Sequence, residues 1–290
     1  MNRLRRWLVA VPLLLVACGV TRLGLPPLET RAGTVASTDG VPIRYLEAGS
    51  GETAVVFLHG WLGSASVWES AMAHLARDYR VVALDLAGHG ASGRDRAAWS
   101  TEQFASDVVA VVDALALRRM VIVGHSMSGP ISVAAANRLG ERVVGLVPVD
   151  TLLDVEWDLP PEVWEEFFGG LRADFPTSVD KFFREALASP NSPKDVIDTI
   201  VARARLADPR IAVPMLEGGR EFDLKGALRA LRVPIRAINS DMHAAKLEVN
   251  RKYAPRFDAL TLAGVGHWPH LEDPQRFHRA LEQCLEVLAR

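Results

Sequence analysis

The stretch Val121-Ile122-Val123-Gly124-His125-Ser126-Met127-Ser128-Gly129 is the most informative part of this chain. A run of β-branched apolar residues stops at a glycine, turns at a serine and continues into small, helix-favouring residues at 131–136. A strand that passes into a helix this quickly needs a strained turn, and Ser126 at its apex would project its hydroxyl beyond the carboxyl end of a sheet. There the positive end of the helix favours a developing anion. The pattern predicts a nucleophilic serine, although an ordinary turn that contains serine has the same residues.

Apolar and helical patterns on both sides of this stretch predict an α/β fold. Short apolar runs are typical of strands buried on both faces of a parallel sheet, and they occur at 54–58, 80–84, 120–123, 143–149, 233–239 and 259–262. Helical patterns separate or follow them at 67–77, 101–117 and 275–288. Strands that alternate with helices form right-handed crossovers and a parallel sheet. Before the first run, Asp39-Gly40 lies between two apolar stretches, which predicts a β-hairpin.

The alternation of strands and helices breaks between residues 152 and 231. That segment has no clear buried strand, and its short helical patterns at 161–171, 178–188 and 193–206 are interrupted by proline and glycine. We therefore expect a helical cap inserted over the carboxyl ends of the strands. The predicted core then consists of a first part, 33–151, and a second part, 232–290.

Composition places limits on the partners of the chain. With 290 residues and 49% hydrophobic content, it can bury the core of one large domain. Its 33 basic and 35 acidic residues nearly balance, which gives no indication of a nucleic-acid partner. Cys18 and Cys284 are far apart in the sequence, so a disulfide framework is not expected, and no Cys/His spacing indicates a metal site. No organic cofactor is implied, and the oligomeric state cannot be inferred from this composition.

The N-terminus has the pattern of an export signal. A basic segment at 2–6 precedes an apolar segment at 7–17 that is too short to span a bilayer, and Cys18 follows directly. The junction Leu15-Val-Ala-Cys18 resembles the lipobox of bacterial lipoproteins, in which the cysteine becomes the acylated N-terminus. We therefore expect a signal at 1–18, a tether at 19–32 and an exported protein held by lipid in the bacterial cell envelope, with Gly19 compatible with the outer membrane. An ordinary secretory signal is the alternative.

A serine nucleophile needs a base, and the base needs an acid that holds its tautomer. His267 lies in a predicted loop between the last strand and the last helix, and Asp241 directly follows the strand at 233–239. Both residues, like Ser126, come just beyond the carboxyl end of a strand, where open α/β sheets bind their ligands. The order Ser, Asp, His is the one that nucleophile-elbow hydrolases use.

These motifs together resemble the α/β-hydrolase superfamily. His59-Gly60-Trp61 follows a strand where the family has its oxyanion-hole loop, and the segment from Asp85 to Ser92 is similar to the signature after the next strand. The segment from Gly266 to Pro274 is similar to the catalytic-histidine region. The resemblance covers the chain from about residue 34 to its end, apart from the variable cap.

The resemblance implies roles for particular residues. Ser126 is the nucleophile, His267 is the base and then the acid, and the amides of Trp61 and Met127 form the oxyanion hole. Asp241 is the favoured triad acid, and Asp150 is the alternative because some family members place the acid after the preceding strand. Ser128 departs from the family pattern, which usually has glycine there, and we expect the turn to adjust to it.

The predicted function is therefore serine hydrolysis of a small carboxylic ester or thioester, in the EC 3.1.1 class. A C–C bond hydrolase, a lactonase or a cofactor-free haloperoxidase would keep the same triad, and a non-catalytic lipoprotein binding module is an alternative of another class. The sequence does not identify the acyl substrate, because specificity depends on the shape of the cap.

Overall fold

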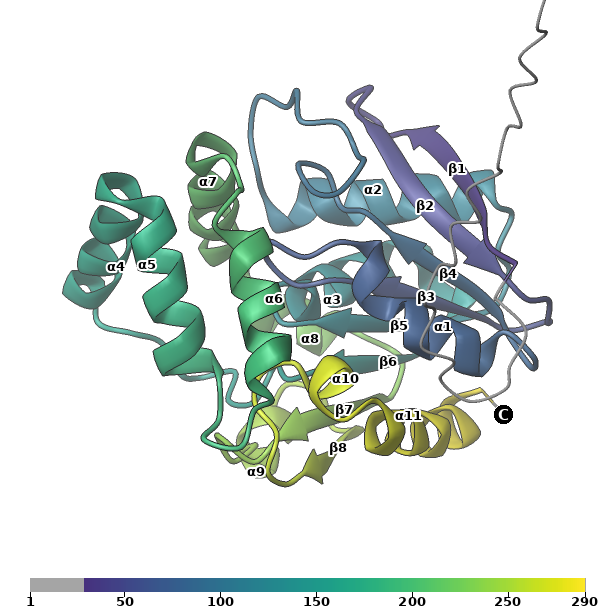
Figure 1. The fold of residues 1–290 in the computed structure, drawn as a ribbon. Coiled ribbons are helices and arrows are strands. Elements are labelled where there is room, and N and C mark those ends of the chain that lie inside the picture. The colour runs from purple at the N-terminus through teal and green to yellow at the C-terminus, as the bar shows by residue number, and fades with distance from the viewer. Residues whose placement is uncertain (1–28, 290) are drawn as a thin grey trace, which may run out of the picture.

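The computed structural model describes residues 29–289, and in it one eight-stranded sheet forms the centre of the molecule (Figure 1). The strand order is β1-β2-β4-β3-β5-β6-β7-β8; β2 is antiparallel to β1 and β4, and the other neighbouring strands are parallel. The predicted α/β-hydrolase fold with a mostly parallel sheet is confirmed. The strands are β1 (Arg31–Ala36), β2 (Pro42–Ala48), β3 (Ala54–Leu58), β4 (Arg80–Leu84), β5 (Met120–His125), β6 (Val143–Val149), β7 (Ile235–Ser240) and β8 (Phe257–Leu262).

The central strands form where the sequence has continuous apolar runs. Every residue of β3 and β5 is buried, as expected for strands covered on both faces. At the edge of the sheet, β1 and β2 form the predicted hairpin, and Gly40 in its turn adopts a φ of 85°, a conformation that suits glycine.

Helices cover both faces of the sheet. One face packs against α1 (Glu69–Leu75) and α11 (Pro274–Leu288), and the other packs against α2 (Thr101–Ala114), α3 (Ser128–Leu139) and α8 (Leu224–Ala230). The shorter α9 (Leu247–Arg251) precedes β8, and α10 (Pro269–Glu272) precedes α11. The two apolar clusters on either side of the sheet hold the strand ends in fixed positions.

Five helices lie between β6 and β7, and four of them gather beyond the sheet (Figure 1). We call these four the cap helices: α4 (Pro161–Ala173), α5 (Phe175–Phe182) with the π-helical turn Phe183–Leu187, α6 (Lys194–Ala204) and α7 (Pro209–Arg220). The sequence patterns indicated the first three but not α7, which contains Pro214 in its interior. Proline removes a helical hydrogen bond, so packing of the buried face of α7 outweighs an unfavourable local preference.

The predicted signal, Cys18 and the tether up to residue 28 lie outside the described residues. Between residues 29 and 289, the structure contains no helix with the length and apolar character required to cross a membrane.

Candidate active site

Ser126 occupies the sharp turn between β5 and α3. Its φ of 53° lies in the left-handed region, which is unfavourable for a residue with a side chain and is typical of strained functional turns. The turn also depends on Gly124, because a Cβ atom there would lie 2.5 Å from the carbonyl oxygen of Ser128. The Ser126 amide donates to the carbonyl of Val149 at 3.0 Å, which joins the turn to the end of β6.

Ser128 makes a specific contact of its own. Its side chain is fully buried, and its hydroxyl donates a hydrogen bond of 2.5 Å to the carbonyl oxygen of His59. Glycine at this position could not make that bond. Ser128 therefore joins the start of α3 to the loop that follows β3, and the turn accommodates serine in place of the glycine that the family usually has.

The loop after β3 approaches the serine closely. A Cβ atom on Gly60 would lie 3.1 Å from the Cβ atom of Ser126 and 2.6 Å from Nδ1 of His125, so a larger residue would displace the turn. The next residue, Trp61, is fixed by a hydrogen bond of 2.9 Å from its indole to the carbonyl of Ala212 in α7. Among the described residues, the backbone amides of Trp61 and Met127 have no hydrogen-bond acceptor.

Buried side chains hold this loop in place. The imidazole of His59 donates from Nδ1 to the Gly60 carbonyl at 2.7 Å and accepts from the Leu86 amide at 3.0 Å. The Nε2 atom of His89 accepts from the Leu62 amide at 3.2 Å. Burial lowers the pKa of His59 to about 4 and that of His89 to about 3, so both rings are neutral near neutral pH and can accept these bonds. Asp85 accepts from two further loop amides, those of Ala65 and Ala91, at 2.7 and 2.9 Å.

His267 lies in the loop after β8 and is bound to the carboxylate of Asp150. Its Nδ1 atom lies 2.7 Å from Oδ2 of Asp150, and because a carboxylate only accepts, we assign the proton to Nδ1. This tautomer leaves Nε2 free to accept a proton. The backbone of the loop is also held: the His267 amide donates to the Leu187 carbonyl at 2.9 Å, and the His267 carbonyl accepts from the ring of His125 at 2.7 Å.

Asp150 is positioned by the end of β6. A φ of 46° turns its side chain out of the strand direction, and the residue is only 7% exposed. Its second carboxylate oxygen, Oδ1, accepts from the Ser240 amide at 2.7 Å. Burial raises the pKa of Asp150, but the hydrogen bonds and charge of His267 and the amide of Ser240 lower it further, so its net pKa lies below the ordinary value and the carboxylate stays ionised.

Asp241, the acid favoured by the sequence analysis, lies elsewhere. Its side chain is exposed and accepts a hydrogen bond of 2.9 Å from the Gly264 amide, in the turn after β8. The geometry therefore reverses the expected preference: the carboxylate on His267 belongs to the alternative residue, Asp150. The reason is topological, because β6 adjoins β5, which carries the serine, whereas β7 is one strand further away.

Glu272 braces the histidine loop and was not singled out from the sequence. Its carboxylate accepts from the amides of Gly266 and Trp268, at 2.7 and 3.2 Å, and from the Ser192 hydroxyl at 2.6 Å. The two amides lie on either side of His267, and Ser192 precedes α6, so the Glu272 side chain joins the histidine loop to the cap. The sequence pointed to Glu272 only through its position within residues 266–274, the segment that is similar to the catalytic-histidine region of the family.

A cavity of about 280 Å³ opens beside Ser126 and His267, and cap aromatics form much of its wall. Four cap aromatics line it, namely Trp164, Phe167, Phe182 and Phe183, whereas Phe168 and Phe175 do not. A second cavity of about 410 Å³ lies toward the 3-10 turn Ala65–Trp68 and α6, and shares Trp61, His125, Phe183 and Trp268 with the first. Such apolar walls around a few polar groups are typical of small-molecule sites.

His270 faces this second cavity with an unusual environment. The residue is 2% exposed, and neither ring nitrogen has a hydrogen-bond partner among the described residues. Burial lowers its pKa to about 3, so the ring is neutral. Across residues 29–289, no three His, Cys, Asp or Glu side chains are arranged to hold a metal ion.

Comparisons with known proteins agree with this fold. Residues 53–195 match a family model described as alpha/beta hydrolase fold. The chain is similar to a pimeloyl-[acyl-carrier protein] methyl ester esterase from Sodalis glossinidius, with 31% identity over 260 residues that cover 83% of this chain and 96% of the relative. It is also similar to a non-heme haloperoxidase from Rhodococcus erythropolis, with 31% identity over 224 residues that cover 71% of this chain and 80% of the relative. Among solved structures, a thermophilic esterase from Thermogutta terrifontis has the same fold, with a TM-score of 0.77 and 22% identity over 89% of this chain and 99% of that one.

Proposed function

The chain belongs to the α/β-hydrolase superfamily and to its ester hydrolases, and on this basis we propose that it cleaves a carboxylic ester or thioester through an acyl-enzyme formed on Ser126. The observation that carries the proposal is the 2.7 Å bond between His267 and Asp150, beside a strained serine turn that lines the same cavity. Nucleophile, base and acid then come from the ends of β5, β8 and β6.

In the first half of the reaction, the Ser126 oxygen attacks the ester carbonyl while Nε2 of His267 takes the hydroxyl proton. The tetrahedral oxyanion accepts hydrogen bonds from the amides of Trp61 and Met127. The assignment of these two amides to the oxyanion hole is supported by the absence of another acceptor for either of them among the described residues. His267 then gives its proton to the departing alcohol or thiol. Asp150 stabilises the imidazolium formed between these steps.

In the second half, water attacks the acyl-enzyme. His267 removes a proton from the water, a second tetrahedral oxyanion forms in the same hole, and the carboxylic acid leaves as His267 returns the proton to Ser126. Every proton transfer passes through Nε2, so the tautomer that Asp150 imposes is needed twice in each turnover.

Replacement of the nucleophile tests this proposal. Ser126→Ala should lower ester turnover by about 10⁴-fold or more and abolish labelling by a fluorophosphonate probe, while the unfolding curve stays similar. Ser128→Gly is the matched control, because it keeps the nucleophile and removes only the hydroxyl that binds the His59 carbonyl. Unchanged turnover in Ser126→Ala would exclude the mechanism, and absence of probe labelling in the wild type would favour a binding protein.

Peroxide-dependent halogenation is a second candidate, favoured by the similarity to a non-heme haloperoxidase. Hydrogen peroxide would replace water as the group that attacks the acyl-enzyme and release a peracid, which can oxidise halide. An assay with an ester, peroxide and bromide distinguishes the two activities. Bromination that depends on Ser126 and exceeds ester hydrolysis would support this alternative.

We also propose that Cys18, which lies outside the described residues, is acylated and holds the enzyme in the bacterial cell envelope. The support is the basic, apolar and small-residue pattern that ends at this cysteine. Labelled palmitate should be incorporated into the wild type and into the Cys284→Ala control, which loses only a buried thiol, but not into Cys18→Ala. Equal labelling of all three proteins would exclude this anchor.

A further inference from the structure

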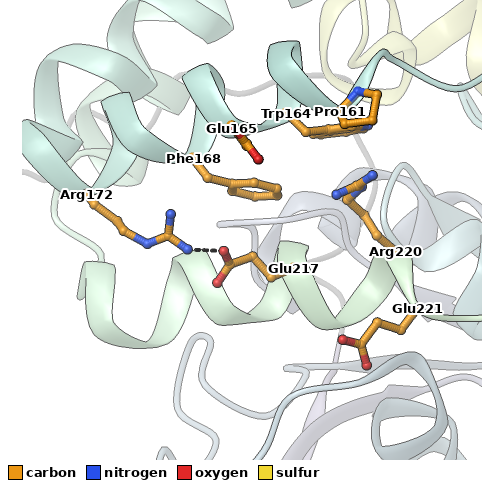
Figure 2. Close-up of a pocket in the computed structure, with 8 residues that line it drawn as sticks. All are labelled: Pro161, Trp164, Glu165, Phe168, Arg172, Glu217, Arg220 and Glu221. Carbon is orange, nitrogen blue, oxygen red and sulfur yellow. Dashed lines mark hydrogen bonds and ion pairs between the residues drawn. The ribbon is translucent and has the colours of Figure 1, made fainter.

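Arg220, at the end of α7, lies at the boundary between the catalytic cavity and the surface. It lines the 280 Å³ cavity that contains Ser126 and His267. It also lines a cleft of about 570 Å³ between α4 and α7, which we call the cap cleft (Figure 2). Trp164 is the other residue common to both, so these two side chains together separate the cleft from the cavity.

The guanidinium of Arg220 is held against an aromatic surface. Its central carbon lies 4.4 Å from the ring centre of Trp164. The indole is itself fixed, because its N–H donates to Asp158 at 3.0 Å and its ring stacks on Phe168 with centroids 5.6 Å apart. Stacking orients a guanidinium without using its N–H donors, so these donors remain available to a ligand.

No acidic side chain forms an ion pair with Arg220 within the described part of the chain. The Arg220 guanidinium forms no hydrogen bond there either, whereas Arg172 in the same cleft is paired with Glu217, as Figure 2 shows. Asp158 accepts a hydrogen bond from the Trp164 indole, and this bond together with the charge of Arg220 lowers the pKa of Asp158, but the two residues form no ion pair. Neither Glu165 nor Glu221 forms an ion pair with Arg220. An unpaired guanidinium beside a catalytic cavity is a candidate anion site.

The catalytic cavity contains no other permanent charge from the described residues. Its remaining lining is apolar, apart from Thr101, Ser126 and two histidines. The cap cleft has three carboxylates, Glu165, Glu217 and Glu221, against two arginines, Arg172 and Arg220, whereas Arg220 is the one permanently charged side chain among the described residues that line the cavity. The charge distribution therefore favours an anion on the inner side of Arg220.

We propose that Arg220 binds an anionic group of the substrate at the end remote from the scissile ester. This inference rests on the proposed function and names its substrate class: esters or thioesters that carry a carboxylate or a phosphate away from the reacting carbonyl. The planar guanidinium can bind either group with two hydrogen bonds. Because the bond is made equally in the ground state and the transition state, it should act mainly on KM.

The experiment compares the purified enzyme with Arg220→Met, which keeps an unbranched apolar side chain against Trp164 and removes the charge. Substrates are monomethyl esters of straight-chain dicarboxylic acids of graded length and methyl esters of monocarboxylic acids of matched length. A third series consists of esters of an uncharged acyl group with a phosphorylated alcohol, and their neutral partners are the same esters of the unphosphorylated alcohol. Arg172→Met is the matched control, since Arg172 lines the cap cleft but not the catalytic cavity.

The measured quantity is the ratio of kcat/KM for each anionic ester to that for its neutral partner. Arg220→Met should lower this ratio by about 10- to 100-fold, through KM, at the preferred chain length, and Arg220→Lys should restore part of it. A fall confined to the dicarboxylate series places the anion on the acyl chain, and a fall confined to the phosphate series places it on the leaving group. Arg172→Met should leave both ratios unchanged.

An unchanged ratio in Arg220→Met, with neutral esters still hydrolysed, would overturn this inference and leave the proposed function intact. An equal fall in Arg172→Met would also overturn it, because the effect would then reflect the general charge of the cap. Failure of the proposed function is recognised separately, by the absence of ester turnover and of probe labelling at Ser126.

Discussion

Charged groups at the carboxyl ends of the strands, which we call the sheet edge, have very different surroundings from those in the cap helices. Asp150 at the end of β6 is 7% exposed, and both of its oxygens accept hydrogen bonds. In the cap, Arg172 and Glu217 form an ion pair between side chains that are 56% and 36% exposed. Buried, fully bonded polar groups cost free energy when a partner is lost, whereas exposed pairs contribute little. The sheet edge is therefore fixed by polar contacts, and the cap must rely on apolar packing.

This difference separates two parts of the function. The groups that perform the chemistry need fixed distances, and the strand ends of a rigid sheet provide them. In our proposal the groups that select the substrate lie on the cap helices, which are joined to the loops at the strand ends by contacts such as the bond from the His267 amide to the Leu187 carbonyl. Mutations should thus have large catalytic effects at the sheet edge and smaller effects, mainly on selectivity, in the cap.

Among variants that keep Ser126, the largest expected effect is that of Asp150→Asn. An amide can donate to Nδ1 of His267, which would place the ring proton on Nε2 and prevent that atom from accepting the serine proton. Turnover should fall on the order of 10³- to 10⁴-fold, as measured by kcat with a simple ester. The Ser240 amide keeps an acceptor in the asparagine oxygen, so the unfolding free energy should change far less.

Asp241→Asn is the matched control for this prediction. Its exposed carboxylate accepts from the Gly264 amide, and an asparagine oxygen can do the same. Turnover should stay within about threefold of the wild type, a small change for the loss of one exposed charge. A larger loss in Asp241→Asn than in Asp150→Asn would show that the acid comes from the end of β7 instead.

The next effect, in the cap, is that of Phe183→Ala. Phe183 is 3% exposed, packs on Trp61 and Trp268 with ring centroids 6.1 and 5.2 Å apart, and lines both cavities. Its removal should cost about 3–5 kcal/mol of unfolding free energy and join the two cavities, so that bulkier acyl esters gain relative to short ones. Urea unfolding and kcat/KM across a series of acyl groups measure the two effects.

Phe168→Ala provides the comparison within the cap. Phe168 is 5% exposed but lines the cap cleft and not the catalytic cavity. A similar loss of stability without a change in acyl selectivity is expected. If both variants shifted selectivity equally, general loosening of the cap would explain the result, and Phe183 would have no particular role.

A smaller effect, again at the sheet edge, concerns acid stability. The buried rings of His59 and His89 have pKa values of about 4 and 3 in the folded protein, compared with about 6.5 for an exposed histidine. Below pH 6.5 the unfolded chain therefore binds protons that the folded chain does not. The part of the unfolding free energy that depends on these two neutral rings is therefore fully present above pH 6.5. It falls as the pH decreases toward 4, by up to about 1.4 kcal/mol per pH unit for each ring.

Urea unfolding between pH 8 and pH 5 measures this slope. His89→Gln should reduce the slope, because one of the buried titrating rings is removed. The same slope in His89→Gln as in the wild type would contradict the assignment of this acid sensitivity to the buried histidines of the loops that follow β3 and β4.

The sequence predicted the sheet edge better than the cap for a physical reason. The serine turn, the hairpin at Asp39-Gly40 and the buried strands each depend on residues that are close in sequence, so their patterns are local. The partner of His267 depends on which strands are neighbours, and a favoured position after β7 could not be distinguished from one after β6 without that order. For the same reason, no sequence pattern indicated that Arg220 would reach the catalytic cavity.

The smallest expected effect is that of Arg184→Gln in the cap. Arg184 pairs with Asp180 at 3.0 Å and with Asp198 of α6 at 2.8 Å, and all three side chains are between 31% and 40% exposed. Exposed pairs of this kind contribute about 0–1 kcal/mol, and salt weakens them further. Urea unfolding at low and high salt should give a loss below about 1 kcal/mol that shrinks as salt is added, and the double variant with Asp198→Asn isolates the pair. A loss above about 2 kcal/mol that persists in high salt would mean that charge fixes the cap as firmly as it fixes the sheet edge, and the cap could then not vary its pocket independently of the catalytic groups beneath it.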